Sequence, residues 1–154
     1  MSPEGPDNAG PRPIDFEGDP LLVSLVRDVN TRDTEEGLSI TLTVGGVLVS
    51  GKLGSRTAYN RACMWHLDQG AERDSAAVRA AFRADVDAAD VDADEASPSA
   101  WPSYVHVQDV RFFDATGASV PRGRHWPSVW WRGRIGAVDG WTLGELRIDS
   151  REDQ

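Results

Sequence analysis

Two short turn signals, each set between runs of apolar residues, constrain the fold of this chain more than any other feature. The first is Gly45-Gly46, which separates L-S-I-T-L-T-V (38–44) from V-L-V-S-G-K-L (47–53). Alternation of apolar and polar residues predicts half-buried strands. Two glycines suit a two-residue loop because both positions can adopt a positive φ. We therefore predict a β-hairpin in which Val44 faces Val47.

The second turn signal is Asp139-Gly140, within W-W-R-G-R-I-G-A-V-D-G-W-T-L-G-E-L (130–146). Asp tolerates positive φ and Gly adopts it freely, so this pair favours a tight hairpin turn. We predict that Trp130–Val138 folds back on Trp141–Ile148. Three of the six tryptophans would then lie in this one hairpin.

An apolar pattern that slips by one residue marks the segment Tyr104–Phe113. Val105 and Val107 share one face of the predicted strand, whereas Val110 and Phe112 share the other. Such a slip predicts a bulge or a tight bend. Glycines suit bends, and Gly51, opposite Ile40, and Gly144 are the natural places for them. Bent strands are typical of a small closed sheet.

Three helices are predicted around these strands. Asp19-Pro20 begins the first, because Asp accepts hydrogen bonds from unpaired N–H groups and Pro suits the first helical position. An apolar stripe follows at helical spacing and ends near Asn30; its members are Leu21, Leu22, Leu25, Val26 and Val29. Ser55 is expected to cap the second helix, which closes at Gly70. The third should span Ser75 to about Val86.

These elements predict an α+β fold with an N-terminal helix, a helical insertion and five antiparallel strands. The strands form either a strongly bent sheet or a small SH3- or Sm-like barrel. The domain should span residues 19–148, between a disordered arm (1–18) and a disordered tail (149–154). The insertion, 55–100, ends in an acidic linker, Asp85–Glu95, which we interpret as a solvated tether rather than a docking segment. Asp114–Ser128 is expected to be a polar loop.

Charge and composition exclude several classes of function. The net charge is −9, and residues 1–100 hold 18 acidic and 9 basic side chains, which argues against tracking a phosphate backbone. The first residues have no basic and apolar signal, and no run is long enough to cross a membrane. A single cysteine, Cys63, excludes an internal disulfide. We expect a cytoplasmic protein.

No arrangement of residues in the sequence predicts a catalytic or metal-binding site. The three histidines, His66, His106 and His125, lack partners at ligand spacing, and no phosphate-binding loop or nucleophile motif occurs. His106 is expected to have a structural or surface role, and Cys63 to be a small buried hydrophobe. Asp139 is first of all a turn residue. We predict a non-enzyme without catalytic residues, metal or cofactor.

Arginine and tryptophan concentrate late in the chain and suggest a partner surface, because both are enriched at binding hot spots. The candidate residues are Arg122, Arg124, Trp126, Trp131, Arg132 and Arg134. Adjacent Trp130 and Trp131 must point to opposite faces of a sheet, so one of them is inward. An intramolecular role remains open: the arginines could neutralise Asp85–Glu95, or pair across the hairpin, with Glu145 opposite Arg134.

The sequence resembles the gas vesicle accessory protein U family of bacteria. Four features carry the resemblance: I-T-L-T-V-G-G-V-L-V-S-G-K-L (40–53), Tyr59, V-H-V-Q-D-V-R-F-F (105–113) and W-R-G-R-I-G-A-V-D-G-W-T-L-G-E-L (131–146). Together they cover roughly residues 20–70 and 101–148. The pattern W-R-G-x-I-x-x-V-D-G-x-x-L-G is the most specific of them.

The resemblance implies a cytoplasmic, gas-vesicle-associated accessory protein that is not part of the shell. It would act in assembly, clustering or regulation by binding shell proteins or other gas vesicle proteins, with self-association as an open alternative. The family supplies no catalytic residues. Two other classes stay in view: an Sm-like nucleic-acid-binding module, and a barrel that binds or converts a small molecule. No nucleic-acid or membrane partner is expected.

Overall fold

The computed structural model describes residues 18–32, 37–69, 76–91, 101–120 and 129–147, and for 86–91 the backbone alone. Residues 1–17 of the predicted arm, the tail, residues 92–95 of the acidic linker and the residues Arg122, Arg124 and Trp126 therefore lie outside the described residues. In chain order, the elements are α1 (Pro20–Arg32), β1 (Leu38–Val44), β2 (Val47–Gly54), α2 (Arg56–Gln69), α3 (Ala76–Val91), β3 (Tyr104–Phe113), β4 (Ser119–Val120), β5 (Trp131–Arg134), the 3₁₀ turn η2 (Ile135–Ala137) and β6 (Gly140–Leu143).

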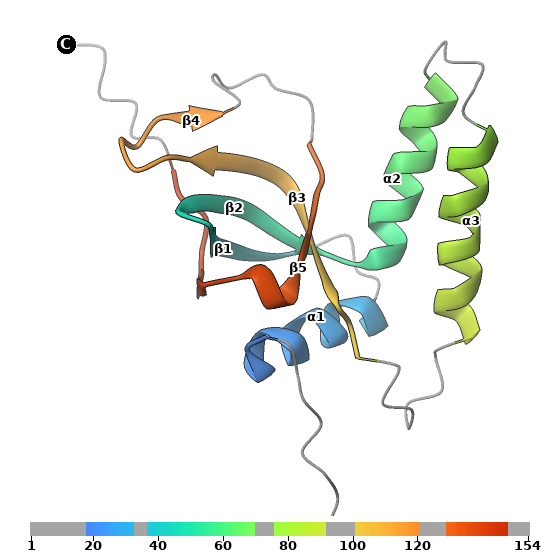
Figure 1. Ribbon diagram of the computed structural model, residues 1–154, viewed down its shortest axis with the longest axis horizontal. Helices are drawn as coiled ribbons and strands as arrows, with labels where there is room; N and C mark the ends of the chain where they lie inside the picture. Colours follow the sequence, from blue (N-terminus) through green and yellow to red (C-terminus); the bar gives the residue numbers. More distant parts are fainter. Residues whose placement is uncertain (1–17, 33–36, 70–75, 92–100, 121–128, 148–154) are drawn as a thin grey trace, which may run out of the picture.

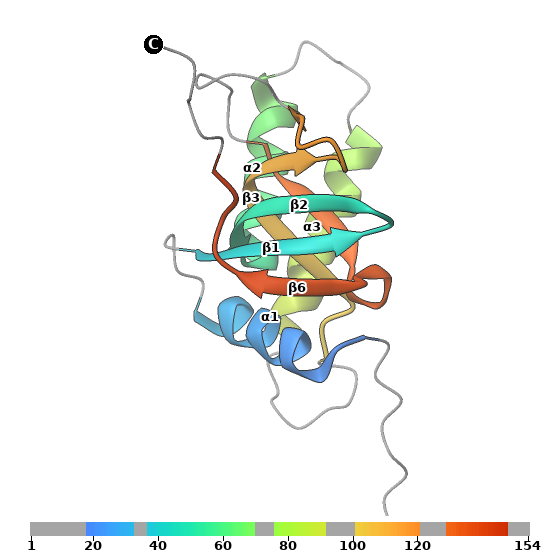
Figure 2. The same cartoon turned by 90° about the vertical axis from the view of Figure 1, so that its left-hand side faces the viewer.

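The strands form one antiparallel sheet in the order β4-β3-β2-β1-β6, and β5 pairs with β3 as well. Helices α2 and α3 lie side by side on one side of the sheet, and α1 lies beneath the sheet and contacts β2 (Figure 1). Figure 2 shows β2, β1 and β6 next to one another, with α1 beneath β6. The predicted α+β class is confirmed. The sheet has six strands rather than five, and it is not closed into a barrel.

The first predicted hairpin is confirmed in register. Val44 pairs with Val47, and Ile40 pairs with Gly51. Gly45 and Gly46 adopt φ values of 56° and 82°, as a two-residue turn between strands requires. Local alternation and turn chemistry were therefore sufficient to determine this element.

The second predicted hairpin is wrong. β5 pairs with β3 and β6 pairs with β1, so the two runs around Asp139-Gly140 never pair with each other. Neither Asp139 nor Gly140 has a positive φ. The chain instead makes the 3₁₀ turn at Ile135, whose side chain is buried. A long strand with an unoccupied edge, β3, offers β5 a non-local partner that the local pattern cannot reveal.

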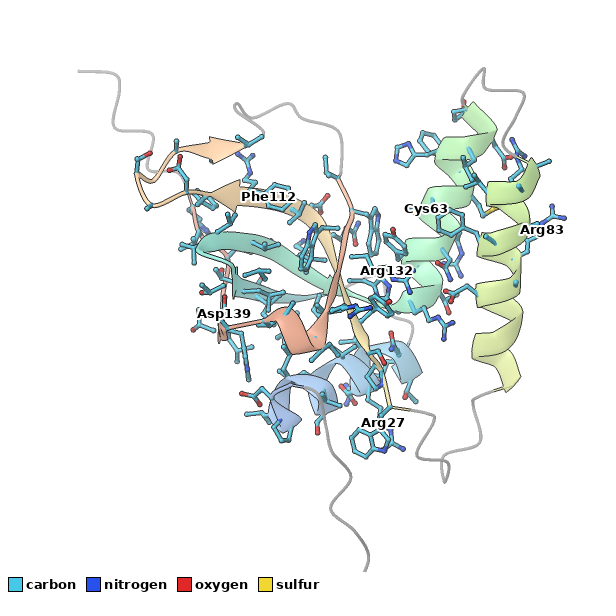
Figure 3. All side chains as sticks on the ribbon, viewed as in Figure 1. Arg27, Cys63, Arg83, Phe112, Arg132 and Asp139 are labelled. Atoms are coloured by element: carbon cyan, nitrogen blue, oxygen red, sulfur yellow. The ribbon has the colours of Figure 1, made fainter. Side chains whose placement is uncertain are left out.

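Asp139 has another structural role. Its Oδ2 accepts a hydrogen bond from the N–H of Gly45 at 2.8 Å, and its own N–H donates to the carbonyl of Thr43 at 2.8 Å. Asp139 therefore ties the end of the 3₁₀ turn to the tip of the first hairpin. This side chain points to the sheet end at which β1 turns into β2 (Figure 3).

The predicted bulge in Tyr104–Phe113 is confirmed. The pairing of β3 with β2 shifts between Ser50 and Lys52, and Asp109 adopts a φ of 52°. Two residues of β3 therefore oppose Gly51, and the extra residue lets both Val107 and Val110 face the core. A Cβ atom on Gly51 would lie 2.5 Å from the carbonyl oxygen of Gln108, so this close approach requires glycine.

The core lies between the sheet and α1. It contains Leu22, Val23 and Val26 of α1, together with strand residues and Ile135. Burial of each such aliphatic side chain contributes about 1.5–3 kcal/mol. Leu21, which we expected on the buried stripe, is 60% exposed, and Val23 is buried in its place. The expected cap is confirmed, because the Asp19 carboxylate accepts from the N–H groups of Leu21 and Leu22.

The outer parts of the sheet differ from the sequence-based predictions in two places. β4 pairs with the end of β3 inside the segment Asp114–Ser128 that was predicted to be a loop. At the other edge, Gly144 has a φ of 105°, which confirms the predicted bend. Beyond it, the N–H of Leu146 donates to the hydroxyl of Ser50. The chain therefore crosses the face of the sheet opposite the core.

Replacing Gly46 by Val should lower the free energy of unfolding by about 1–2 kcal/mol, because a β-branched residue is strained at positive φ. A Cβ atom on Gly46 would meet no atom within 4 Å, so the loss reports mainly the strain of the backbone. Gly46→Asn should cost less, since Asn tolerates this region. Urea denaturation of the three proteins checks this. Equal stability of the Val and Asn variants would show that φ at this position does not limit folding.

Candidate functional site

The described part of the predicted partner surface lies on β5. Trp131 is half-buried and packs against the hydrophobic core, whereas Arg132 and Arg134 are exposed on the opposite face of the strand. Trp130 lies near Tyr59 of α2. The expectation that Trp130 and Trp131 point to opposite faces is therefore confirmed. Of the six candidate residues, Trp131 is largely structural, and the two described arginines face outward.

Arg132 and Arg134 have different surroundings. The guanidinium of Arg132 lies over the ring of Tyr104, 4.0 Å from its centre, a stacking arrangement that arginine favours. Arg134 is opposite Tyr104 in the register, and its side chain makes no hydrogen bond or ion pair with the described residues. The alternative in which Arg134 pairs with Glu145 across the second hairpin is wrong, because β5 pairs with β3.

The outward face of β3 next to β5 carries a buried aromatic cluster. His106 pairs with Arg132 on one side and with Gly54 on the other. The ring of Tyr59 in α2 packs on the His106 imidazole with centres 4.7 Å apart, and Trp130 meets the edge of Tyr59 at 6.0 Å. This cluster joins α2 to the sheet.

Gly54 gives Trp130 its place in the cluster. A Cβ atom on Gly54 would lie 2.5 Å from Cζ3 of the Trp130 ring. The indole therefore occupies the space that any other residue at the end of β2 would fill. The sequence contains no local sign of this contact, because Gly54 and Trp130 are far apart in the chain.

The imidazole of His106 is held neutral. The residue is 2% exposed, and neither ring nitrogen has a hydrogen-bond partner among the described residues. Burial, with a smaller contribution from the positive charge of Arg132, lowers the pKa of His106 to about 4. We expected a structural or surface role, and the structure places this side chain inside.

Asp85 joins the two helices of the insertion. Its carboxylate accepts hydrogen bonds from Arg56 Nε at 2.9 Å and from Asn60 Nδ2 at 2.8 Å, and it forms a second contact with the Arg56 guanidinium. The hydrogen bonds from Arg56 lower the pKa of Asp85 to about 2. The predicted linker boundary is wrong, because α3 continues to Val91 and Asp85 is one of its helical residues.

The thiol of Cys63 and the phenol of Tyr59 lie next to each other on α2. Burial raises the pKa of the Cys63 thiol, and burial raises the pKa of Tyr59 to about 12. A protonated thiol is a poor nucleophile. Within the described ranges, no three His, Cys, Asp or Glu side chains come together to hold a metal ion. Among the described helices, none is long and apolar enough to cross a membrane.

Replacing Asp85 by Asn should lower the free energy of unfolding by roughly 1–2 kcal/mol at neutral pH, because the Arg56 guanidinium loses its anionic partner. Asp68→Asn is the matched control: Asp68 also pairs with an arginine across α2 and α3, but its side chain is 55% exposed. Its loss should be about 0–1 kcal/mol. Denaturant unfolding compares the variants. Equal losses of unfolding free energy would show that the Asp85 ion pair is no stronger than the exposed Asp68 pair.

The same Asp85 pair makes a pH-dependent contribution to stability. Because its pKa falls from 3.8 unfolded to about 2 folded, the contribution is complete above pH 3.8 and is lost as the pH falls through 2. The stability difference between the wild type and Asp85→Asn should therefore shrink across this window. Melting curves recorded down to acid pH test it. A difference that stays constant would show that Asp85 is not the titrating group.

Comparison with known proteins identifies the family. The chain matches the family model described as "Gas vesicle protein GvpU-like" over residues 19–146, which span every element from α1 to β6. No curated protein and no solved structure gives a match. The matched range covers most of the chain and agrees with the resemblance carried by residues 40–53, Tyr59, residues 105–113 and residues 131–146. The chain belongs to the GvpU-like family of gas vesicle proteins.

Proposed function

We propose that this protein is a cytoplasmic, non-catalytic accessory protein that acts in gas vesicle assembly, clustering or regulation by binding shell proteins or other gas vesicle proteins. Membership of the GvpU-like family carries the proposal, since it associates the chain with gas vesicles. The absence of a catalytic role is part of the proposal. It is supported by the low pKa of the buried His106 imidazole and the raised pKa of the Cys63 thiol, which leave the first a weak base and the second protonated.

The partner surface of this proposal is the outward face of β5. Arg132 and Arg134 expose two positive charges in a protein of net charge −9. β5 pairs with β3 alone among the described strands, so its other edge can accept a further extended segment. A positive strand at a sheet edge suits an acidic surface or acidic segment of a gas vesicle protein.

The test uses the buoyancy of gas vesicles. Purified vesicles are mixed with the full chain and floated by centrifugation, and the protein carried upward is quantified. Arg132→Ala together with Arg134→Ala should lower the bound fraction at least several-fold, while Tm changes little because exposed contacts contribute about 0–1 kcal/mol. Added salt should weaken binding of the wild type, since exposed charges are screened.

A charge-matched control is Arg83→Ala with Arg147→Ala. Both arginines are exposed, and Arg83 is on α3 on the side away from the sheet (Figure 3). This double variant should float with vesicles as the wild type does. Equal loss of binding in both double variants would show that binding depends only on net charge, and would contradict the proposal that β5 is the partner surface. A collapsed fold in the Arg132 and Arg134 variant would reassign these side chains to structure.

Nucleic acid is the alternative partner for an arginine-bearing strand. An Sm-like module would be retained on a nucleic-acid column at low salt and released at high salt. The net charge of −9 opposes this. Retention that is lost in the Arg132 and Arg134 variant, together with failure to float with vesicles, would replace the proposed function by nucleic-acid binding.

A further inference from the structure

Within the described residues, the helix pair α2–α3 is attached to the rest of the molecule mainly through the contact of α2 with β3. The N–H of Arg56 at the start of α2 also donates a hydrogen bond to Oδ1 of Asn30 in α1 at 2.9 Å. α3 packs on α2, and α2 packs on β3. The hydrophobic core, by contrast, lies between the sheet and α1. Figure 1 shows the pair standing on the opposite side of β3 from the strands of the first hairpin. The attachment of the helix pair therefore depends on side chains different from those that hold the sheet and α1 together.

His106 lies at the centre of this interface. Its side chain is 2% exposed and lies under Tyr59 of α2, and its two ring nitrogens have no hydrogen-bond partner among the described residues. A neutral imidazole can be packed this way at the cost of unsatisfied polar atoms. An imidazolium cannot, because burying an unpaired charge costs far more.

The charged groups around His106 do not offer it an anionic partner. Arg56 and Arg132 approach from α2 and β5, and both oppose a further positive charge. Asp85 of α3 favours the imidazolium, but its carboxylate is already bound by Arg56 and Asn60. The phenol of Tyr59, which packs on the imidazole, is neutral, and so is the thiol of Cys63 next to Tyr59, since burial raises the pKa of each. The Oδ1 atom of Asn60 is buried and makes no bond to the imidazole.

We propose that His106 is a proton-operated latch: its protonation releases the α2–α3 helix pair from the sheet while the core formed with α1 stays folded. Release would uncover the rings of Tyr59 and Trp130 beside Arg132, so the outward face of β5 would change its shape and exposed apolar area. The latch does not depend on which partner that face binds.

The direction of the effect follows from linkage. The pKa of His106 is lowered from 6.5 to about 4 in the closed state, so the open state binds the proton first as the pH falls. Closure is therefore complete above pH 6.5 and weakens between 6.5 and 4. One proton taken up on opening raises the opening equilibrium constant by up to about tenfold for each pH unit.

Hydrogen exchange of the full chain, corrected for intrinsic rates, tests the latch between about pH 7 and pH 5, above the range in which most carboxylates titrate. Protection of amides in α2 and α3 should fall by up to about tenfold per pH unit. Protection in β1 and β2 should stay constant. Constant protection in α2 and α3, or an equal fall in all four elements, would overturn the proposal.

Variants assign the effect to one imidazole. His106→Phe keeps an aromatic ring against Tyr59 and cannot be protonated, so the pH dependence of α2 and α3 should disappear; His106→Leu should do the same. His66→Phe and His125→Phe change the two other histidines of the chain and should keep the wild-type dependence. Persistence of the dependence in His106→Phe, with its fold intact at neutral pH, would contradict the latch. If both His106 variants fail to fold, the wild-type exchange series alone decides.

Discussion

The pairing of β5 with β3 is the interaction on which the rest of this structure depends. It places Trp131 against the core and sends Trp130, the residue before it, to the other face, over Gly54. It also sets Arg132 opposite His106, so that the exposed charge of the sheet lies next to the buried imidazole. One four-residue ladder therefore positions both the outward arginines and the interface that holds the helices.

The two faces of the sheet are stabilised by different physics. The face toward α1 buries aliphatic side chains with aromatic rings packed around them, and its stability comes from removal of apolar area from water. The face toward α2 is aromatic and polar, with Tyr59 on His106 and the ion pair of Asp85 behind them. The stability of a buried polar cluster depends on the protonation state of its members, whereas aliphatic side chains do not titrate. The proposed latch would add a pH-sensitive attachment of the helices to a core whose buried side chains do not titrate.

Local patterns determined those parts of the fold whose partners are near in the chain. The first hairpin could be predicted in register because Gly45-Gly46 sets the turn and alternation sets the face. The helix caps at Asp19 and Ser55 followed from side chains that reach N–H groups two or three residues away. The bulge at Asp109 was visible as a slip of the apolar period.

The sequence alone did not determine which strands pair across long separations, and the predicted site depended on that. Asp139-Gly140 has the chemistry of a tight turn, yet Asp139 binds the tip of the first hairpin instead. The reason is that β5 pairs with the edge of β3 and β6 pairs with the edge of β1. Burial of His106 and the ion pair of Asp85 likewise arise from contacts between distant segments. Local backbone preferences act over a few residues, so the sequence by itself determined the turn at Gly45-Gly46 and the helix caps. Burial and strand pairing depend on segments that are far apart in the chain, so only the tertiary structure decided the surroundings of Arg132 and His106.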